Sequence, residues 1–209
     1  MPKEIEYFAQ GSTDAIAQQL LGSRLLYHSP QGLMGGLIVE TEAYLGPLDS
    51  TAHSYQNKHT KANEPIYSPP GVVYIYTIYG QFLLNVTTQK MGIPQAVLIR
   101  AIEPTVGKDL MLANRPKKSG FEMTNGPGKL MKALGIQDRR MNFELFGESA
   151  LDIDLFKPKI PKKIGLSARI GVSNIDSWAE KPLRFFVSGN PYVSGISKRD
   201  MDLENFGWR

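Results

Sequence analysis

The sequence contains no cysteine in its 209 residues. This absence excludes disulfide bonds, zinc sites built on thiolates and cysteine nucleophiles. Only three histidines are present, and none stands in a His-x-x-x-His or Glu-x-x-His spacing, so the sequence predicts no metal site. The chemistry must therefore rest on carboxylates, hydroxyls, histidine and backbone groups.

Long apolar runs are also missing. No run approaches the roughly 20 residues that a membrane helix needs, and the first residues lack the apolar core of a signal peptide. We therefore expect no membrane association and a protein that stays in the compartment where it is made. Internal repeats and linkers are absent too, and a 209-residue chain that is 42% hydrophobic predicts one domain over residues 1–209.

Positive charge is in slight excess, with a formal net charge of +4 and a pI of about 9.2. Such a balance favours a polyanionic partner without naming one. A single basic cluster in a loop is usually a solvated surface, but several of them beside aromatic segments favour nucleic acid. The clusters lie at residues 58–61, 115–118, 139–140 and 157–163.

Two carboxylates stand in an otherwise apolar β pattern at residues 37–46. Strand alternation places Glu40 and Glu42 on one face and Thr41 on the other. A buried carboxylate is costly unless it is paired, hydrogen-bonded or chemically active, so one interpretation is a general base or nucleophile in a cleft. In the other, the two carboxylates lie at the solvent-exposed end of an edge strand and have no function. Arg100 interrupts the apolar run 95–102, so we expect it to face an anion or polar cavity; a salt bridge to either glutamate fits equally well.

A tyrosine-rich hairpin is predicted at residues 72–86, where two β runs meet at Tyr79-Gly80-Gln81. Tyr74 and Tyr76 share a face, and Tyr79 lies at the tip. Tyrosine is common in strands for packing reasons alone. Pocket-lining aromatics combined with a protruding one also suit proteins that unstack and hold a nucleobase.

The remaining segments carry weaker signals. We expect a long loop at 46–71 that contains His53, and a chain end at 202–209 that is loosely held. Glu103-Pro104 is expected to end the strand that begins at Gln95. The other expected elements are helices at 13–21 and 105–112, a compact helix unit at 124–135, and strands at 24–28, 33–44, 150–156 and 183–187.

Several motifs together resemble the alkyladenine (3-methyladenine) DNA glycosylase family. The resemblance covers about residues 6 to 195, keeps its order throughout and includes late segments at 169–172 and 181–185. The motifs that carry it are Val39-Glu40-Thr41-Glu42-Ala43-Tyr44-Leu45-Gly46, Ala52-His53-Ser54, Tyr74-Ile75-Tyr76-Thr77-Ile78-Tyr79-Gly80, Leu98-Ile99-Arg100-Ala101 and Asn125-Gly126-Pro127.

This resemblance implies an α+β fold: a single domain with a curved, mostly antiparallel β-sheet, surrounding helices and a protruding β-hairpin. It implies a monomer without metal or cofactor that acts on double-stranded DNA containing alkylated or deaminated purines, such as 3-methyladenine and hypoxanthine. The enzyme would flip the purine, hydrolyse its N-glycosidic bond and leave an abasic site without cutting the strand. The short N-terminus fits a bacterial-type, cytoplasmic, nucleoid-associated protein.

The resemblance also assigns roles, and it selects Glu42 over Glu40 as the carboxylate that activates water. Arg100 and the main chain near Ile170 would hold that water. The pocket walls around the flipped base would be Tyr44, His53 and Tyr76; Asn85 would crowd the 2-amino group of a purine, and Tyr79 would fill the gap in the duplex.

Two other functions remain open at this stage. A non-catalytic nucleic-acid-binding module would use the same aromatic residues to stack bases, and Glu42 would then be dispensable. A carbohydrate hydrolase would use Glu40 and Glu42 as its carboxylate pair. That reaction needs its two carboxylates on opposite sides of the scissile bond, which two residues on one strand face do not easily provide.

Overall fold

The long strand β2 (Gly32–Tyr44) organises the sheet because it is paired along both edges. On one edge lies β5 (Gln95–Val106), and the other edge is shared by β1 (Arg24–Ser29) and β8 (Arg184–Val187). All of these pairings are antiparallel. A strand paired on both sides and buried along most of its length suits the Leu, Ile and Val residues of this segment.

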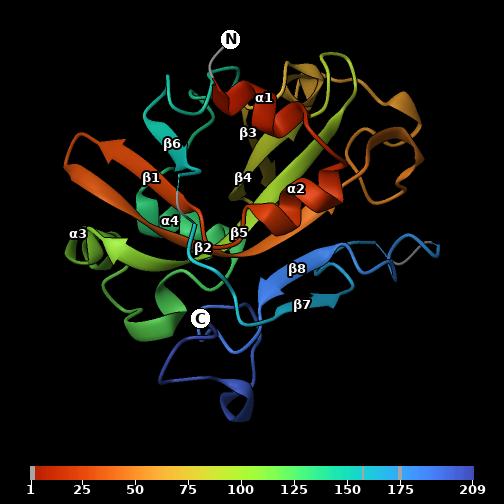
Figure 1. Cartoon of the computed structure of the whole chain (residues 1–209). Helices are drawn as coiled ribbons and strands as arrows, with labels where there is room; N and C mark the ends of the chain where they lie inside the picture. Colours follow the sequence, from red (N-terminus) through yellow and green to blue (C-terminus); the bar gives the residue numbers. More distant parts are fainter. Residues whose placement is uncertain (1–2, 157, 174–175) are drawn as a thin grey trace.

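The computed structural model describes residues 3–156, 158–173 and 176–209, and Lys157 of the last basic segment therefore lies outside the described residues. Within these ranges the sheet has eight strands in the order β3-β4-β5-β2-β1-β6, with β8 beside β2 and β7 beside β8. Figure 1 shows how the sheet curls. The further strands are β3 (Val73–Ile78), β4 (Gln81–Thr88), β6 (Leu151–Asp154) and β7 (Ile164–Ser167).

Four α-helices are present in the described ranges, and two of them pack most extensively on the sheet. Helix α2 contacts β2 and β5, and α4 contacts β4 and β5. In Figure 1 helix α1 and the C-terminal segment lie at opposite ends of the molecule. The helices are α1 (Lys3–Ala9), α2 (Thr13–Gln19), α3 (Lys108–Asn114) and α4 (Pro127–Leu134).

The two faces of β2 have different neighbours. Thr41 is fully buried, and its Oγ1 donates a hydrogen bond to the carbonyl oxygen of Ala17 in α2 at 2.8 Å. Since neighbouring residues of a strand point to opposite faces, Glu40 and Glu42 are directed away from α2. Helix α2 thus covers one face of β2 and leaves the other for the carboxylates.

The expected strand end at Glu103-Pro104 is wrong, and the helix expected at 105–112 is present but begins and ends later. Strand β5 continues to Val106, and α3 begins only at Lys108, after Gly107 with φ +69°. Strand β4 pairs with β5 only as far as Leu98, so Pro104 lies at an edge, where the sheet tolerates a residue without an N–H group. The long partner strand β2 keeps β5 extended beyond the proline.

The chain end is not loosely held, contrary to the prediction. Trp208 is only 1% exposed, and its Nε1 donates a hydrogen bond to Glu103 Oε2 at 2.7 Å. The amide of Arg209 donates to the carbonyl oxygen of Ile160 at 3.0 Å. A large aromatic side chain with a buried polar partner anchors the terminus, because its apolar ring leaves water while its N–H remains paired.

The observed architecture confirms the α+β fold with a single domain, a curved antiparallel sheet and a β3-β4 hairpin. One large apolar cluster joins residues of the sheet with residues of α2 and α4. Among the described residues, no helix has the length and apolar character required to cross a membrane.

Candidate active site

The two strand carboxylates meet one guanidinium in the interior. Glu40 and Glu42 are both 0% exposed, and Arg100 on β5 is 5% exposed. Arg100 Nε lies 2.7 Å from Glu40 Oε1, and Arg100 Nη1 lies 3.0 Å from Glu42 Oε1. The pairing of β2 with β5 is irregular around Glu40, but both carboxylates still reach the same arginine. The shared face expected from the sequence is therefore present, and of the two alternatives for Arg100 the salt bridge is present, to both glutamates.

Glu40 is a structural counter-ion. Its Oε1 also accepts a hydrogen bond from Arg184 Nε at 2.7 Å, and its Oε2 accepts one from the amide of Ser194 at 2.8 Å. Burial raises the pKa of Glu40, but Arg100 and Arg184 outweigh burial and hold the pKa below its ordinary value. Glu40 is therefore ionised at neutral pH and unsuited to take up a proton.

Glu42 has a different environment. Its Oε1 accepts from the amide of Ile170 at 2.8 Å, and its Oε2 accepts from the hydroxyl of Tyr44 at 2.9 Å. Burial, the largest influence, raises the pKa of Glu42, and Arg100, the Ile170 amide and Tyr44 only partly counteract it. Two neighbouring carboxylates whose pKa values are pushed apart are typical of an acid–base site, and Glu42 is the one poised to accept a proton.

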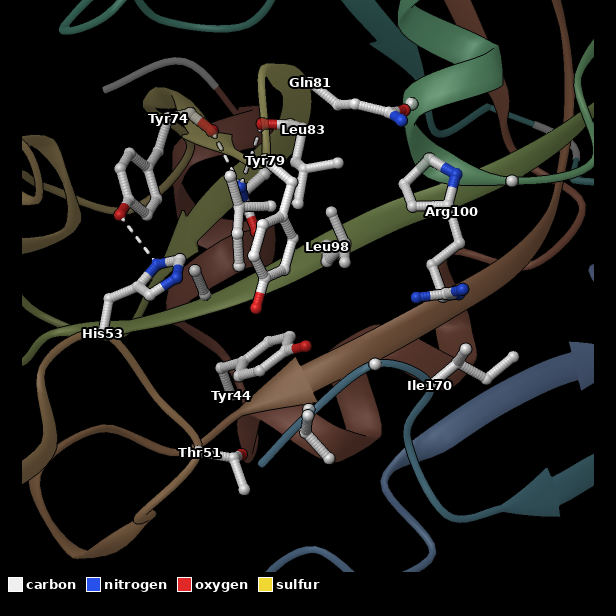
Figure 2. A pocket seen from close by; sticks show the side chains of 18 of the residues that line it. Tyr44, Thr51, His53, Tyr74, Tyr79, Gln81, Leu83, Leu98, Arg100 and Ile170 are labelled. Atoms are coloured by element: carbon white, nitrogen blue, oxygen red, sulfur yellow. Dashed lines mark hydrogen bonds between the residues drawn. The ribbon is translucent and has the colours of Figure 1, made fainter. Parts of the chain in front are cut away.

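A cavity of about 490 Å³ opens beside this cluster (Figure 2). Arg100 and Ile170 lie on one side of it, and His53 and Tyr74 lie on another. Glu42 is covered by residues of the wall, because Tyr44 and Arg100 line the cavity and also contact its carboxylate. The size and the mixture of aromatic and polar groups suit a flat heterocycle.

His53 forms part of this wall as a neutral ring. Its Nδ1 lies 3.1 Å from the hydroxyl of Tyr74, and its ring stacks on Tyr76 with centroids 3.6 Å apart. Burial lowers the pKa of His53 to about 4, and the nearby Lys58 adds to the effect. At neutral pH the imidazole carries no charge, so it does not repel a cationic ligand.

Tyr79 occupies the tip of the β3-β4 hairpin and is 93% exposed. Tyr79 and Gly80 have φ values of 48° and 71°, which are typical of a two-residue type I′ turn. This turn continues the twist of the strands and projects the phenol ring from the surface. An exposed aromatic side chain on a well-paired hairpin is a candidate wedge between bases.

A model of the methylpurine-DNA glycosylase family matches residues 6–191 of the sequence. The chain belongs to this family. Three bacterial relatives carry the name "Putative 3-methyladenine DNA glycosylase". The one from Latilactobacillus sakei is 48% identical, covering 99% of this chain and 97% of its own. Those from Enterococcus faecalis and Staphylococcus saprophyticus are 44% and 46% identical, covering 100% and 97% of this chain and 91% and 98% of their own.

Membership of the methylpurine-DNA glycosylase family makes the protein a DNA glycosylase, a hydrolase of DNA repair. It also confirms the resemblance seen in the sequence. The structure brings most of the expected site residues together, since the cavity lining includes Tyr44, His53, Tyr79, Asn85, Arg100 and Ile170.

The structure locates two of the expected residues outside the cavity lining. Glu42 lies behind the hydroxyl of Tyr44, and Tyr76 lies behind the ring of His53, where it borders a separate polar hollow. Asn85 lines the cavity, and its Nδ2 donates to the carbonyl oxygens of Tyr74 and Leu83 at 3.0 and 3.2 Å. These bonds fix the orientation of the Asn85 side chain.

Sequence reasoning missed the ionic partners that surround the site. Arg184 pairs with Glu40, and Arg169 pairs with Asp49, from positions 144 and 120 residues away. A single acidic or basic residue in the sequence gives no signal of such a distant partner. Among the described residues, no group of three or more His, Asp or Glu side chains is arranged to hold a metal ion.

Proposed function

We propose that this glycosylase is monofunctional and purine-specific, and that it releases alkylated and deaminated purines from double-stranded DNA. The observation that carries the proposal is Glu42, a buried carboxylate with a raised pKa directly behind the wall of an aromatic cavity. The names of the bacterial relatives support 3-methyladenine as one substrate. We also propose that the protein acts as a monomer, as its resemblance to the family implies.

The flipped base would enter the cavity and stack on electron-rich rings. An N-alkylated purine is cationic, and cations are attracted to the faces of tyrosine rings. Tyr44 and His53 border the cavity, and neutral His53 adds no positive charge. This environment favours alkylated over undamaged purines, because a normal purine lacks the charge that the rings attract.

Hydrolysis needs one water and one base. Glu42 would take a proton from the water while the water oxygen bonds to the anomeric carbon, and the electrons of the broken C–N bond would leave with the purine. Arg100 would keep the carboxylate oriented. Lys129 lines the cavity, but its Nζ donates to Asn125 Oδ1 at 2.8 Å. We assign it no nucleophilic role, and the product would be an uncut abasic site.

Duplex DNA would rest on both sides of the hairpin tip. A second hollow, next to the cavity, is bordered by Gly80 and Gln81 of the hairpin and by basic side chains. Gln81 and Gly128 line both hollows, so they form the common wall. Basic groups here would bind backbone phosphates while Tyr79 enters the stack. The basic residues of the second hollow are Arg115, Lys117, Lys118 and Lys132.

Base release tests the proposal directly. One duplex would carry hypoxanthine, and another would be methylated to contain 3-methyladenine and 7-methylguanine. We expect release of damaged purines, with strand breaks only after alkali is added. Tight binding of both duplexes without any release would instead favour a nucleic-acid-binding module.

The rate of base release should depend on pH through Glu42. A general base must be ionised, so activity falls as the pH drops through the pKa of Glu42. Because that pKa lies above the ordinary glutamate value of 4.5, the decline in kcat/KM should begin at a correspondingly higher pH. A pH–rate profile in a constant-ionic-strength buffer measures this limb. An acidic limb whose midpoint lies at or below the ordinary glutamate pKa of 4.5 would contradict the role of Glu42 as base.

Removing the aromatic side chain at the hairpin tip should weaken base flipping and leave the fold intact. Tyr79→Ala is expected to lower kcat/KM about 10- to 100-fold, since stacking of one aromatic residue on a base contributes ~1–3 kcal/mol. The control is Leu203→Ala, which removes another exposed apolar side chain, 63% exposed, from the C-terminal segment. Equal kcat/KM values for Tyr79→Ala and the control would remove Tyr79 from the mechanism.

A further inference from the structure

A buried ion pair lies directly behind the Tyr44 wall of the cavity. Arg169 Nη1 lies 2.6 Å from Asp49 Oδ2, and Arg169 Nη2 lies 3.0 Å from Asp49 Oδ1. Both side chains are 0% exposed. Such a two-pronged pair fixes the relative orientation of both groups, because the planar fork of arginine matches the carboxylate.

Each member of the pair also holds the end of β2. Arg169 Nη1 donates to the carbonyl oxygen of Ala43 at 3.0 Å, and Asp49 Oδ2 accepts from the amide of Leu45 at 3.1 Å. The guanidinium carbon lies 4.8 Å from the centroid of the Tyr44 ring. Tyr44 is therefore held through its ring and through the backbone on both sides.

The pair reaches Glu42 by two routes. Tyr44 donates its hydroxyl to Glu42 Oε2 at 2.9 Å, and Ile170, the neighbour of Arg169, donates its amide to Oε1 at 2.8 Å. Two of the donors on the carboxylate thus depend on the position of Arg169. The pair does not contact the carboxylate itself.

We propose that Arg169 and Asp49 are positioning residues for base excision, which set the Tyr44 hydroxyl and the Ile170 amide on the carboxylate of Glu42. The proposal rests on the role of Glu42 given above. It goes beyond the expected site residues, because neither Arg169 nor Asp49 borders the cavity. The pair acts on the reaction through Tyr44 and Ile170.

The conservative variants Asp49→Asn and Arg169→Lys test this role. Asparagine keeps the shape of the side chain without its charge, and lysine keeps the charge without the fork. We expect single-turnover base release to slow about 10- to 100-fold, since small displacements of catalytic groups have effects of this size. The dissociation constant for the duplex should remain that of the parent protein.

Two further readouts separate positioning from a purely structural role. The acidic limb of the pH–rate profile should move to higher pH in Arg169→Lys, because the donors that lower the pKa of Glu42 become looser while both charges of the pair remain. Millimolar guanidinium should restore part of the rate of Arg169→Ala and none of the rate of Glu42→Gln. The charged and titratable groups around Glu42 are Glu40 and Tyr44 on β2, Arg100 on β5 and, through Glu40, Arg184 on β8.

The control is Asp138→Asn, which breaks an arginine–aspartate pair at the surface, where Arg140 Nη2 lies 2.8 Å from Asp138 Oδ2. It should leave the rate and the pH profile unchanged. If the interior variants keep the parent rate per folded molecule and the parent pH profile, the positioning role is overturned.

An activity-independent measurement distinguishes this outcome from failure of the proposed function. Carbon NMR of the Glu42 carboxyl in the parent and Arg169→Lys proteins should give a higher pKa in the variant, which keeps both charges of the pair and loses only the fork. An unchanged titration overturns the inference, even where the parent protein releases no purine. A parent protein without base release but with the expected NMR shift overturns only the proposed function.

Discussion

Glu42→Gln is expected to slow single-turnover base release by about 10²- to 10⁴-fold, the range typical of losing a general base. Glutamine has nearly the same shape as glutamate but cannot take a proton from water at neutral pH. The variant should still bind a damaged duplex, because the cavity wall and the hairpin are unchanged. Gel-based measurement of alkali-labile sites under excess enzyme gives the rate directly.

The same variant should be at least as stable as the parent protein. The pKa of Glu42 is raised by burial, so its ionised form destabilises the fold at neutral pH. Removing the charge relieves this cost, as is common for residues retained for function. Parent-level release by Glu42→Gln would eliminate the proposed mechanism, and loss of DNA binding would indicate damage to the site as a whole.

Glu40→Gln is expected to have the opposite effect on stability. Glu40 bridges Arg100 and Arg184 in the interior, and removing one charge of a buried ionic network typically costs about 3–5 kcal/mol. We expect the free energy of unfolding to fall by this order. Urea unfolding monitored by circular dichroism measures the change.

The pH dependence of this loss follows from the pKa of Glu40, which lies below the ordinary value. A carboxylate with a lowered pKa stabilises the fold above its unfolded pKa, and the contribution disappears as the pH falls through its folded pKa. The difference between parent and variant should therefore be complete at neutral pH and shrink in acid. The control, exposed Glu64→Gln, should change stability by less than about 0.5 kcal/mol.

Local sequence patterns were sufficient to predict the strands and turns that depend on neighbouring residues. Alternation in residues 37–44 identified β2 and the common face of Glu40 and Glu42, and the residues at Tyr79-Gly80 identified the hairpin tip. They failed where a distant partner overrides local preference. Pro104 remains in a strand because β2 extends beside it, and Trp208 is buried because Glu103 accepts its N–H group.

The sequence alone determined the absence of cysteine chemistry, the excess of positive charge and the family, because its motifs keep their order along the chain. The tertiary structure decided how the environments of the two carboxylates differ. Glu40 and Glu42 occupy equivalent positions on one strand face, and their difference arises from Arg184, Ser194, Tyr44 and Ile170. The pKa of a buried group depends on desolvation and on charges close in space, and three of these four neighbours are more than 100 residues away in sequence.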